Sequence, residues 1–274
     1  MRFRLYREYG ALNSPPVFDA VEQGLKQLGH DVVHEHEDVA VIWSVLWAGR
    51  MRSNKTIYDQ CRQQGKSVMI IEVGNLKRGV TWRLSLNHIN NLGGFGNEKN
   101  LDHSRPQQLG INLQPVSDTR RGEILIACQH QESLQWQGMP EMKNWVADTI
   151  EKIKQYTHRR IRVRYHPRSA FPFKQSGVVV ERPVLVPGSY DDFDIFYNYH
   201  CVINHNSGPA VQAAISGVPV LCDQSSLAAD LSIKWSELDS PYLPDRTEWF
   251  VKLCHTEWTV EEIRQGIPIT RLFS

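Results

Sequence analysis

Apolar residues in the first part of the chain form two kinds of pattern. Continuous apolar runs of about four to eight residues are typical of strands in a parallel sheet, and a spacing of three or four is typical of an amphipathic helix. One such helix opens at Pro15-Pro16 and ends before Gly29, as these residue types favour. The pattern predicts strands over 3–6, 31–36, 39–43 and 67–73, and helices over 15–28 and 53–64.

A similar alternation begins again at Glu123, after a stretch over 84–118 that is rich in Asn, Gly and Gln and is expected to form loops. The second series predicts strands over 124–128, 160–165, 178–180, 201–204 and 218–222, and helices over 142–156, 209–215, 247–255 and 260–265. Alternating strands and helices predict an α/β protein with two Rossmann-like domains facing a central cleft. We expect domains over 1–115 and 116–245, with the helices of 246–274 crossing back to the first domain.

The composition excludes several other classes of protein. The chain has 274 residues, of which 41% are hydrophobic and 22% charged, so it is expected to fold. No apolar run approaches the roughly 20 residues of a membrane span, and the first residues lack the apolar core of a signal peptide. The five cysteines contain no CxxC pair, which argues against a zinc site or a disulfide framework. We therefore expect a soluble cytoplasmic protein without a bound metal.

Charge is distributed unevenly although the net charge is only +1. Between Arg50 and Arg83 there are eight basic residues and only two acidic ones, Asp59 and Glu72. Such a run is either a solvated face or a surface for a polyanion such as DNA. The candidate contacts to an acceptor or to DNA are Arg50, Arg52, Lys55, Lys77, Arg78 and Arg83.

Two segments of the second half carry residues suited to an anionic ligand at the carboxyl ends of strands. In VINHNSGPAVQAAISGVPVLCD, a strand leads through Asn206, Ser207 and Gly208 into a helix whose first amides could bind a phosphate. Ser207 could instead be an ordinary N-cap of that helix. His166 and Arg168 follow another strand, and Arg offers a planar fork of donors to a diphosphate. Taken alone, a histidine such as His166 is more often packed or exposed than in contact with a ligand.

Two carboxylates are candidates for a general base. Glu72 ends the buried run over 68–71, so burial could raise its pKa and make it a usable proton acceptor. It could instead be paired with Lys77, Arg78 or Arg83. Glu8, at the end of the first strand, is the rival candidate. The Asp-rich segment over 191–194 is expected to begin a helix rather than to bind a metal.

These segments together resemble the GT-B glycosyltransferases, in particular those of the capsule-polysaccharide type. The resemblance lies in Tyr165-His166-Pro167-Arg168, in His205-Asn206-Ser207-Gly208 with Gly217-Val218-Pro219-Val220, and in the acidic strand end of Ile71-Glu72-Val73-Gly74 with the following Asn75-Leu76-Lys77-Arg78. The chain is also similar to small GT-B proteins of bacteriophages that glycosylate hydroxymethylated pyrimidines in DNA, such as 5-hydroxymethylcytosine.

The resemblance implies a nucleotide diphosphate sugar as donor, with a UDP-sugar favoured, and no tightly bound cofactor or metal. Glu72 or Glu8 would deprotonate the acceptor hydroxyl, and a phage protein would act in the host cytoplasm. The implied donor-binding residues are Gln129, His166, Arg168, Asn206, Ser207 and Gly208.

Several functions remain open on the sequence alone. A DNA glycosyltransferase would use the basic run for the phosphate backbone and Trp43, Trp47 or Trp82 for a flipped base. A glycan transferase would perform the same chemistry on another acceptor. A non-catalytic nucleotide-binding module and a sugar-nucleotide epimerase are the further alternatives.

Overall fold

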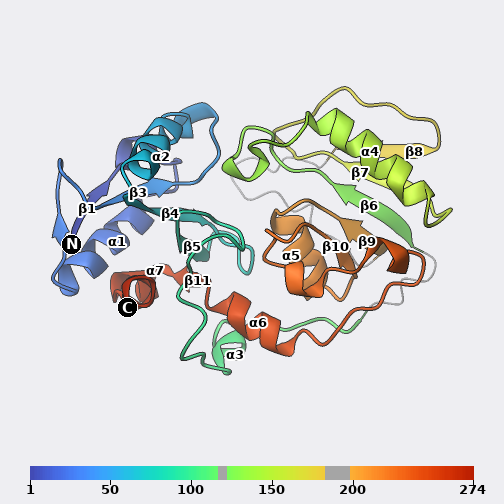
Figure 1. Cartoon of the computed structure of the whole chain (residues 1–274). Coiled ribbons are helices and arrows are strands. Elements are labelled where there is room, and N and C mark those ends of the chain that lie inside the picture. The colour runs from blue at the N-terminus through green and yellow to red at the C-terminus, as the bar shows by residue number, and fades with distance from the viewer. Residues whose placement is uncertain (117–121, 183–197) are drawn as a thin grey trace. The chain divides into compact units, whose positions relative to one another are not determined.

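The computed structural model describes residues 1–116, 122–182 and 198–274 (Figure 1). It divides into two compact units. Unit 1 comprises Met1–Leu109, Glu132–Leu134 and Val251–Ser274, and unit 2 comprises Gly110–Gln131 and Gln135–Phe250. The predicted helix start over 191–194 lies outside the described residues.

Unit 1 is built on a six-stranded sheet with the order β11-β5-β4-β3-β1-β2. The strands β2, β1, β3 and β4 are parallel, whereas β5 is antiparallel to β4 and β11 is antiparallel to β5. Its strands are β1 (Arg2–Leu5), β2 (Asp31–Val32), β3 (Val39–Trp43), β4 (Ser67–Val73), β5 (Thr81–Leu86) and β11 (Glu257–Thr259). Its helices are α1 (Pro15–Gln27), α2 (Asn54–Gln63), α3 (Arg105–Gln108), α7 (Val260–Arg264) and α8 (Ile267–Phe273), and α6 (Thr247–Cys254) leads into it.

Helices cover both faces of this sheet. The α2 residues Ile57, Tyr58 and Cys61 pack with Ile42 and Ile70, which alternate inward along β3 and β4. The C-terminal helix α7, red in Figure 1, lies beside α1, where Gly24 provides the necessary space. A Cβ atom at Gly24 would lie 2.4 Å from the carbonyl oxygen of Ile263. The end of the chain is therefore an integral part of unit 1.

The strands at one side of this sheet differ from the sequence prediction. Residues 84–86, expected to be loop, belong to β5, and β11 occupies residues for which no strand was predicted. Both strands contain buried polar or charged side chains, so neither shows a continuous apolar run. The predicted strand over 31–36 is reduced to the two residues of β2.

A buried ionic cluster connects β11 to the loop between β4 and β5. Glu257 is fully buried, and its carboxylate lies 2.9 Å from Nη2 of Arg83. It also accepts hydrogen bonds from the amides of Asn75 and Leu76, at 2.6 and 2.9 Å, and from Oγ1 of Thr81 at 2.9 Å. A Cβ atom at Gly74 would lie 2.3 Å from Oε2 of Glu257, so only glycine fits there. Glu257 therefore fixes the course of the chain directly after β4.

Unit 2 contains a second, five-stranded parallel sheet with the order β10-β9-β6-β7-β8. Its strands are β6 (Glu123–Ala127), β7 (Ile161–Arg164), β8 (Val178–Glu181), β9 (Tyr199–Ile203) and β10 (Val220–Leu221), and its helices are α4 (Met142–Lys154) and α5 (Gly208–Ile215). The chain runs outward from β6 to β7 on one side, while β9 lies on the other side of β6. The order reverses between β6 and β9, which is where open parallel sheets bind ligands.

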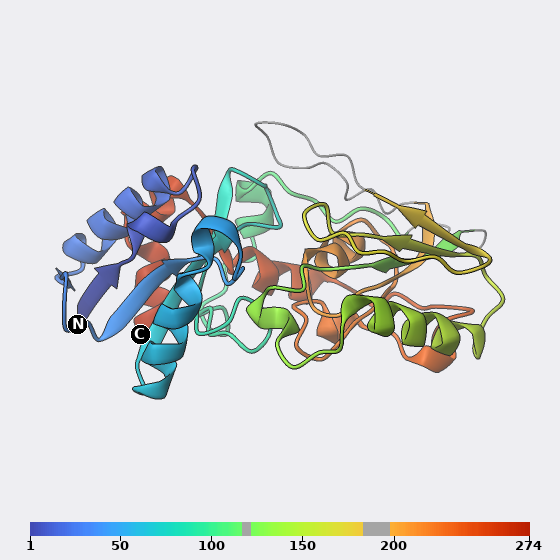
Figure 2. The same ribbon diagram turned by 90° about the horizontal axis from the view of Figure 1, so that it is seen from above.

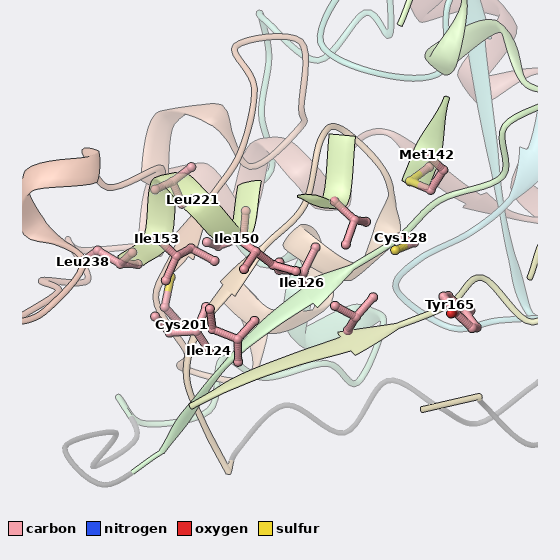
Figure 3. Packing of buried hydrophobic residues seen from close by; sticks show 14 of the residues in the cluster. Ile124, Ile126, Cys128, Met142, Ile150, Ile153, Tyr165, Cys201, Leu221 and Leu238 are labelled. Carbon is pink, nitrogen blue, oxygen red and sulfur yellow. The ribbon is translucent and has the colours of Figure 1, made fainter. Parts of the chain in front are cut away.

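The core of unit 2 forms between its sheet and α4, which lies along one side of the strands in Figure 2. Met142, Val146, Ile150 and Ile153 follow one helical face and are fully buried. In Figure 3, Ile150 and Ile153 point toward the side chains of β6. The small residues of α5, Ala210, Ala213 and Ala214, are also fully buried. These contacts confirm the predicted α/β class and the two Rossmann-like units.

We expect Glu257→Gln to destabilise unit 1 strongly. The variant leaves the guanidinium of Arg83 buried without its counter-charge, which typically costs about 3–5 kcal/mol. Urea unfolding monitored by tryptophan fluorescence measures the change. Glu261→Gln is the matched control, because Glu261 is exposed and pairs with Arg264 at the surface. Equal effects of the two substitutions would contradict the role given to Glu257.

Candidate functional sites in the two units

Glu72 lies near the carboxyl end of β4 in unit 1 and is only partly exposed. Its Oε2 accepts a hydrogen bond of 2.7 Å from the hydroxyl of Ser44, which directly follows β3. Its Oε1 accepts a hydrogen bond of 2.9 Å from the backbone amide of Val73. Both oxygens are thus held in place by the ends of two adjacent parallel strands, β3 and β4.

Burial raises the pKa of the Glu72 carboxyl above its ordinary value, because desolvation disfavours the charged form. The hydrogen bonds from Ser44 and Val73 and the charges of Arg83 and Arg78 act in the opposite direction but are weaker. A carboxylate with a raised pKa is a better proton acceptor than an exposed one. The environment of Glu72 thus has the property that the sequence predicted for a general base.

Arg83 departs from the prediction that it contacts an acceptor. It pairs in register with Glu72 on one side and Glu257 on the other, so the three residues form a row across β4, β5 and β11. Its side chain is only 6% exposed and donates to Glu257 and to the carbonyl of Ile89. Arg83 is therefore a buried structural cation and is unavailable to DNA.

Glu8 lies in a short 3-10 helix, Arg7–Tyr9, after β1 and is exposed. The structure gives it neither the burial nor the strand-end hydrogen bonds that surround Glu72. Of the two predicted candidates, Glu72 is the one with the environment of a base.

The remaining residues of the basic run lie in different settings. Lys55 pairs with Asp59 at 2.5 Å, and Arg62 and Lys66 bond to Asn87 and Glu37. Arg50 and Arg52 are exposed in the segment between β3 and α2, and Arg50 Nε donates to the carbonyl of Gly10 at 3.1 Å. Lys77 and Arg78 lie in the loop after β4, with Arg78 exposed. These two segments follow the strand ends that carry Ser44 and Glu72.

The tryptophans expected near an acceptor are mostly part of the core. Trp43 and Trp82 are 2% and 4% exposed, with ring centroids 5.3 Å apart. Trp47 is partly exposed and lies against Tyr58. Among these three, only Trp47 presents any appreciable surface to a ligand.

In unit 2, Gln129 and Asn206 join the two loops at the reversal of strand order. Gln129 Nε2 donates to Oδ1 of Asn206 at 3.1 Å. The backbone amide of Asn206 in turn donates to Oε1 of Gln129 at 3.2 Å. Asn206 Nδ2 also donates to the hydroxyl of Ser225 at 2.8 Å. Both amide side chains are buried, at 3% and 6% exposure. The predicted donor-binding residues Gln129 and Asn206 therefore hold these two loops together.

In the loop before α5, one of the two backbone amides predicted to be free for a phosphate, that of Ser207, is already hydrogen-bonded. The Ser207 amide donates to Oδ1 of Asn204 at 2.8 Å, so the expectation that this amide is free is wrong. The Ser207 side chain does not cap the helix, and it bonds to Asn204 instead. Gly208 begins α5 and Pro209, which has no N–H group, follows it. Asn204, which the sequence analysis missed, organises this turn and also bonds to the carbonyl of Ala127 at 2.7 Å.

His166 and Arg168 lie directly beyond β7. The Arg168 amide donates to Nδ1 of His166 at 3.1 Å, which leaves the proton of a neutral imidazole on Nε2. The ring of His130, which follows β6, lies edge-on to His166 with centroids 5.1 Å apart. His166 is partly exposed and Arg168 exposed. The turn thus fixes His166 as a donor through Nε2 and places a guanidinium two residues away.

Within 1–116, 122–182 and 198–274, no group of three or more His, Cys, Asp or Glu side chains is arranged to hold a metal ion. No helix in these ranges is both long enough and apolar enough to cross a membrane.

No protein-family model and no curated protein matches this sequence. Among solved structures, the chain is similar to the β-Kdo 2,4 transferase of Thermosulfurimonas dismutans KpsC, with 12% identity, a TM-score of 0.53, and coverage of 92% of this chain and 89% of that one. The β-Kdo 2,7 transferase of the same KpsC matches with 12% identity, a TM-score of 0.47, and coverage of 98% and 99%. The first similarity shows that the chain has the GT-B fold with its two Rossmann-like domains.

We expect Glu72→Gln to stabilise the fold at neutral and alkaline pH. Because the folded state raises the pKa of Glu72, it favours the protonated carboxyl, and this contribution is lost as the pH rises through the raised pKa. The neutral glutamine avoids that loss. In thermal unfolding from pH 4 to pH 8, the midpoint temperature of the variant should rise relative to that of the parent as the pH rises. Glu8→Gln is the control, and a Glu72→Gln midpoint that falls relative to the parent with pH would contradict the desolvation argument.

Proposed function

We propose that the chain is a glycosyltransferase that moves a sugar from a nucleotide diphosphate sugar, with UDP the favoured nucleotide, to a hydroxyl acceptor. The observation that carries this proposal is the partly desolvated Glu72 carboxylate at the ligand-binding edge of one Rossmann-like unit in a chain with the GT-B fold. Desolvation raises the pKa of this carboxyl, which makes it a better proton acceptor for the hydroxyl of an acceptor.

The donor is assigned to unit 2. Nε2–H of His166 and the guanidinium of Arg168 are suited to a diphosphate, whose negative charge grows as the bond between the sugar carbon and the phosphate oxygen breaks. The loop held by Gln129, Asn204 and Asn206 lies at the reversal of strand order, where a nucleotide is expected. The phosphate oxygen keeps the electron pair of the broken bond, and the nucleotide diphosphate leaves.

The acceptor is assigned to unit 1. As the acceptor oxygen bonds to the sugar carbon, its proton passes to the Glu72 carboxylate. We propose that this acceptor is a 5-hydroxymethylated pyrimidine in DNA. Arg50 and Arg52 follow β3, and Lys77 and Arg78 follow β4, so all four lie on segments that leave the sheet beside Ser44 and Glu72. Basic side chains on the segments that follow the proton-accepting carboxylate suit a substrate with a phosphate backbone.

We expect His166→Ala and Arg168→Ala each to weaken the binding of UDP by about 10- to 100-fold, because each removes a hydrogen-bond donor to the phosphates. Isothermal titration calorimetry with UDP gives the dissociation constants. Arg160→Ala is the matched control, since Arg160 is an exposed arginine at the opposite end of β7. An effect of Arg160→Ala as large as those of the other two would indicate general electrostatic attraction rather than a site.

The acceptor is tested by measuring UDP release from a panel of UDP-sugars, with and without duplex DNA containing 5-hydroxymethylcytosine. We expect release that requires the modified DNA and a DNA affinity that falls with salt. Replacing Arg50, Arg52, Lys77 and Arg78 together by Gln should lower that affinity by at least about 100-fold. The control variant replaces four exposed lysines that lie far from these loops in the sequence, namely Lys99, Lys143, Lys154 and Lys234.

The other outcomes separate the alternatives. Release that requires a glycan instead of DNA would make the chain a glycan transferase. Conversion of the UDP-sugar without any acceptor would indicate an epimerase, and UDP binding without turnover a non-catalytic module. Unchanged DNA binding in the four-residue variant of unit 1 would contradict the proposed acceptor surface.

A further inference from the structure

Ser44 has a left-handed backbone conformation, with a φ of 62°, directly after β3. This conformation is unfavourable for residues with a Cβ atom, and glycine adopts it without strain. Ser44 is also only 4% exposed, so the conformation is not a surface turn. A strained residue held by its surroundings is a feature that often marks a functional site.

The hydrogen bonds of Ser44 show what this conformation achieves. Its amide donates to the carbonyl of Ile71 at 2.7 Å and so keeps the residue attached to β4. Its hydroxyl donates to Oε2 of Glu72 at 2.7 Å and accepts from the amide of Leu46 at 3.1 Å. The single hydroxyl proton is therefore directed at the carboxylate, because the Leu46 amide occupies an acceptor position of the same oxygen.

The groups that face Glu72 come from four segments. Ser44 approaches from the end of β3 and the Val73 amide from β4 itself. Arg83 lies beside it on β5, but its guanidinium donates to Glu257, and Arg78 contributes charge from the following loop. Within the described ranges 1–116, 122–182 and 198–274, Ser44 is the only side chain that hydrogen-bonds to the Glu72 carboxylate.

We propose that Ser44 is the positioning residue of Glu72, and that its hydroxyl fixes the rotation of the carboxylate so that one oxygen faces the acceptor. The inference rests on the proposed function, in which Glu72 accepts the proton. Glycine would relieve the backbone at this position but would lose the hydroxyl. Alanine would lose the hydroxyl and keep the strain. Comparison of these two variants separates the role of the side chain from that of the backbone.

The experiment compares Ser44→Gly and Ser44→Ala with the parent. Ser85→Ala is the matched control, because Ser85 is a fully buried serine on β5 whose hydroxyl has no hydrogen-bond partner in the part of the chain described. Carbon-13 NMR follows the titration of the Glu72 carboxyl, which is assigned by the resonance missing from Glu72→Gln. Acceptor-dependent nucleotide release is measured across the same pH range.

We expect both Ser44 variants to raise the pKa of Glu72 further, since a hydrogen bond that favours the charged form is lost. The acid limb of nucleotide release should move to higher pH by the same amount, and the release at its plateau should fall by about tenfold or more through loss of orientation. Ser44→Gly should fold at least as well as Ser44→Ala, and Ser85→Ala should change neither titration nor release.

An unchanged Glu72 titration in both Ser44 variants would overturn the inference, and so would a uniform loss of release without a shift of the acid limb. Failure of the proposed function gives a different result. In that case the Glu72 titration shifts in the Ser44 variants, while Glu72→Gln releases nucleotide as fast as the parent. That result would support the hydrogen bond between Ser44 and Glu72 but would show that neither residue takes part in the reaction.

Discussion

The buried pair of Arg83 and Glu257 is the interaction on which unit 1 depends. A carboxylate taken out of water must have its hydrogen-bonding capacity filled, and Glu257 achieves this with a guanidinium, a hydroxyl and two backbone amides. The same four bonds fix the last strand of the sheet and the loop after β4. Because the Arg83 guanidinium donates to Glu257, Glu72 lies beside a positive charge that is hydrogen-bonded to another carboxylate. The environment of the proposed base is therefore set by a residue near the end of the chain.

In unit 2, neutral side chains form the hydrogen bonds of the buried loops. Its loops meet where the strand order reverses, and their buried polar atoms are satisfied by Gln129, Asn204 and Asn206. Hydrogen bonds among these neutral side chains hold the loops in place. His166 and Arg168 lie in the turn after β7, where His166 is partly exposed and Arg168 is exposed. The proposed function assigns the diphosphate of the donor to these two side chains.

Local patterns in the sequence predict much of this fold and part of the site. The apolar runs of β3, β4, β6 and β9 and the spacing in α4 are sufficient to place these elements. Glu72 is recognisable because it follows such a run. The role of Arg83 is not recognisable, because its partner lies 174 residues away and nothing local distinguishes it from the neighbouring basic residues.

The strained turn at Ser44 is likewise not predictable from the local sequence. Serine rarely adopts a left-handed conformation, so the residue type argues against the turn that it forms. The amide of Ser207 is occupied by Asn204, which lies in the same motif, because a nearby Asn side chain competes with a ligand for a backbone amide. The sequence therefore indicates which strand ends carry polar and charged residues, whereas the contacts in the folded chain decide how the atoms of these residues are used.

The measurement that tests the account most directly compares donor binding with sugar transfer in Glu72→Gln. If Glu72 only accepts the acceptor proton, the variant should bind UDP as tightly as the parent, while acceptor-dependent nucleotide release falls by at least about 100-fold. Release at the parental rate would contradict the assignment of Glu72 as the base. Loss of UDP binding would contradict the division of labour in which unit 2 holds the donor and unit 1 the base.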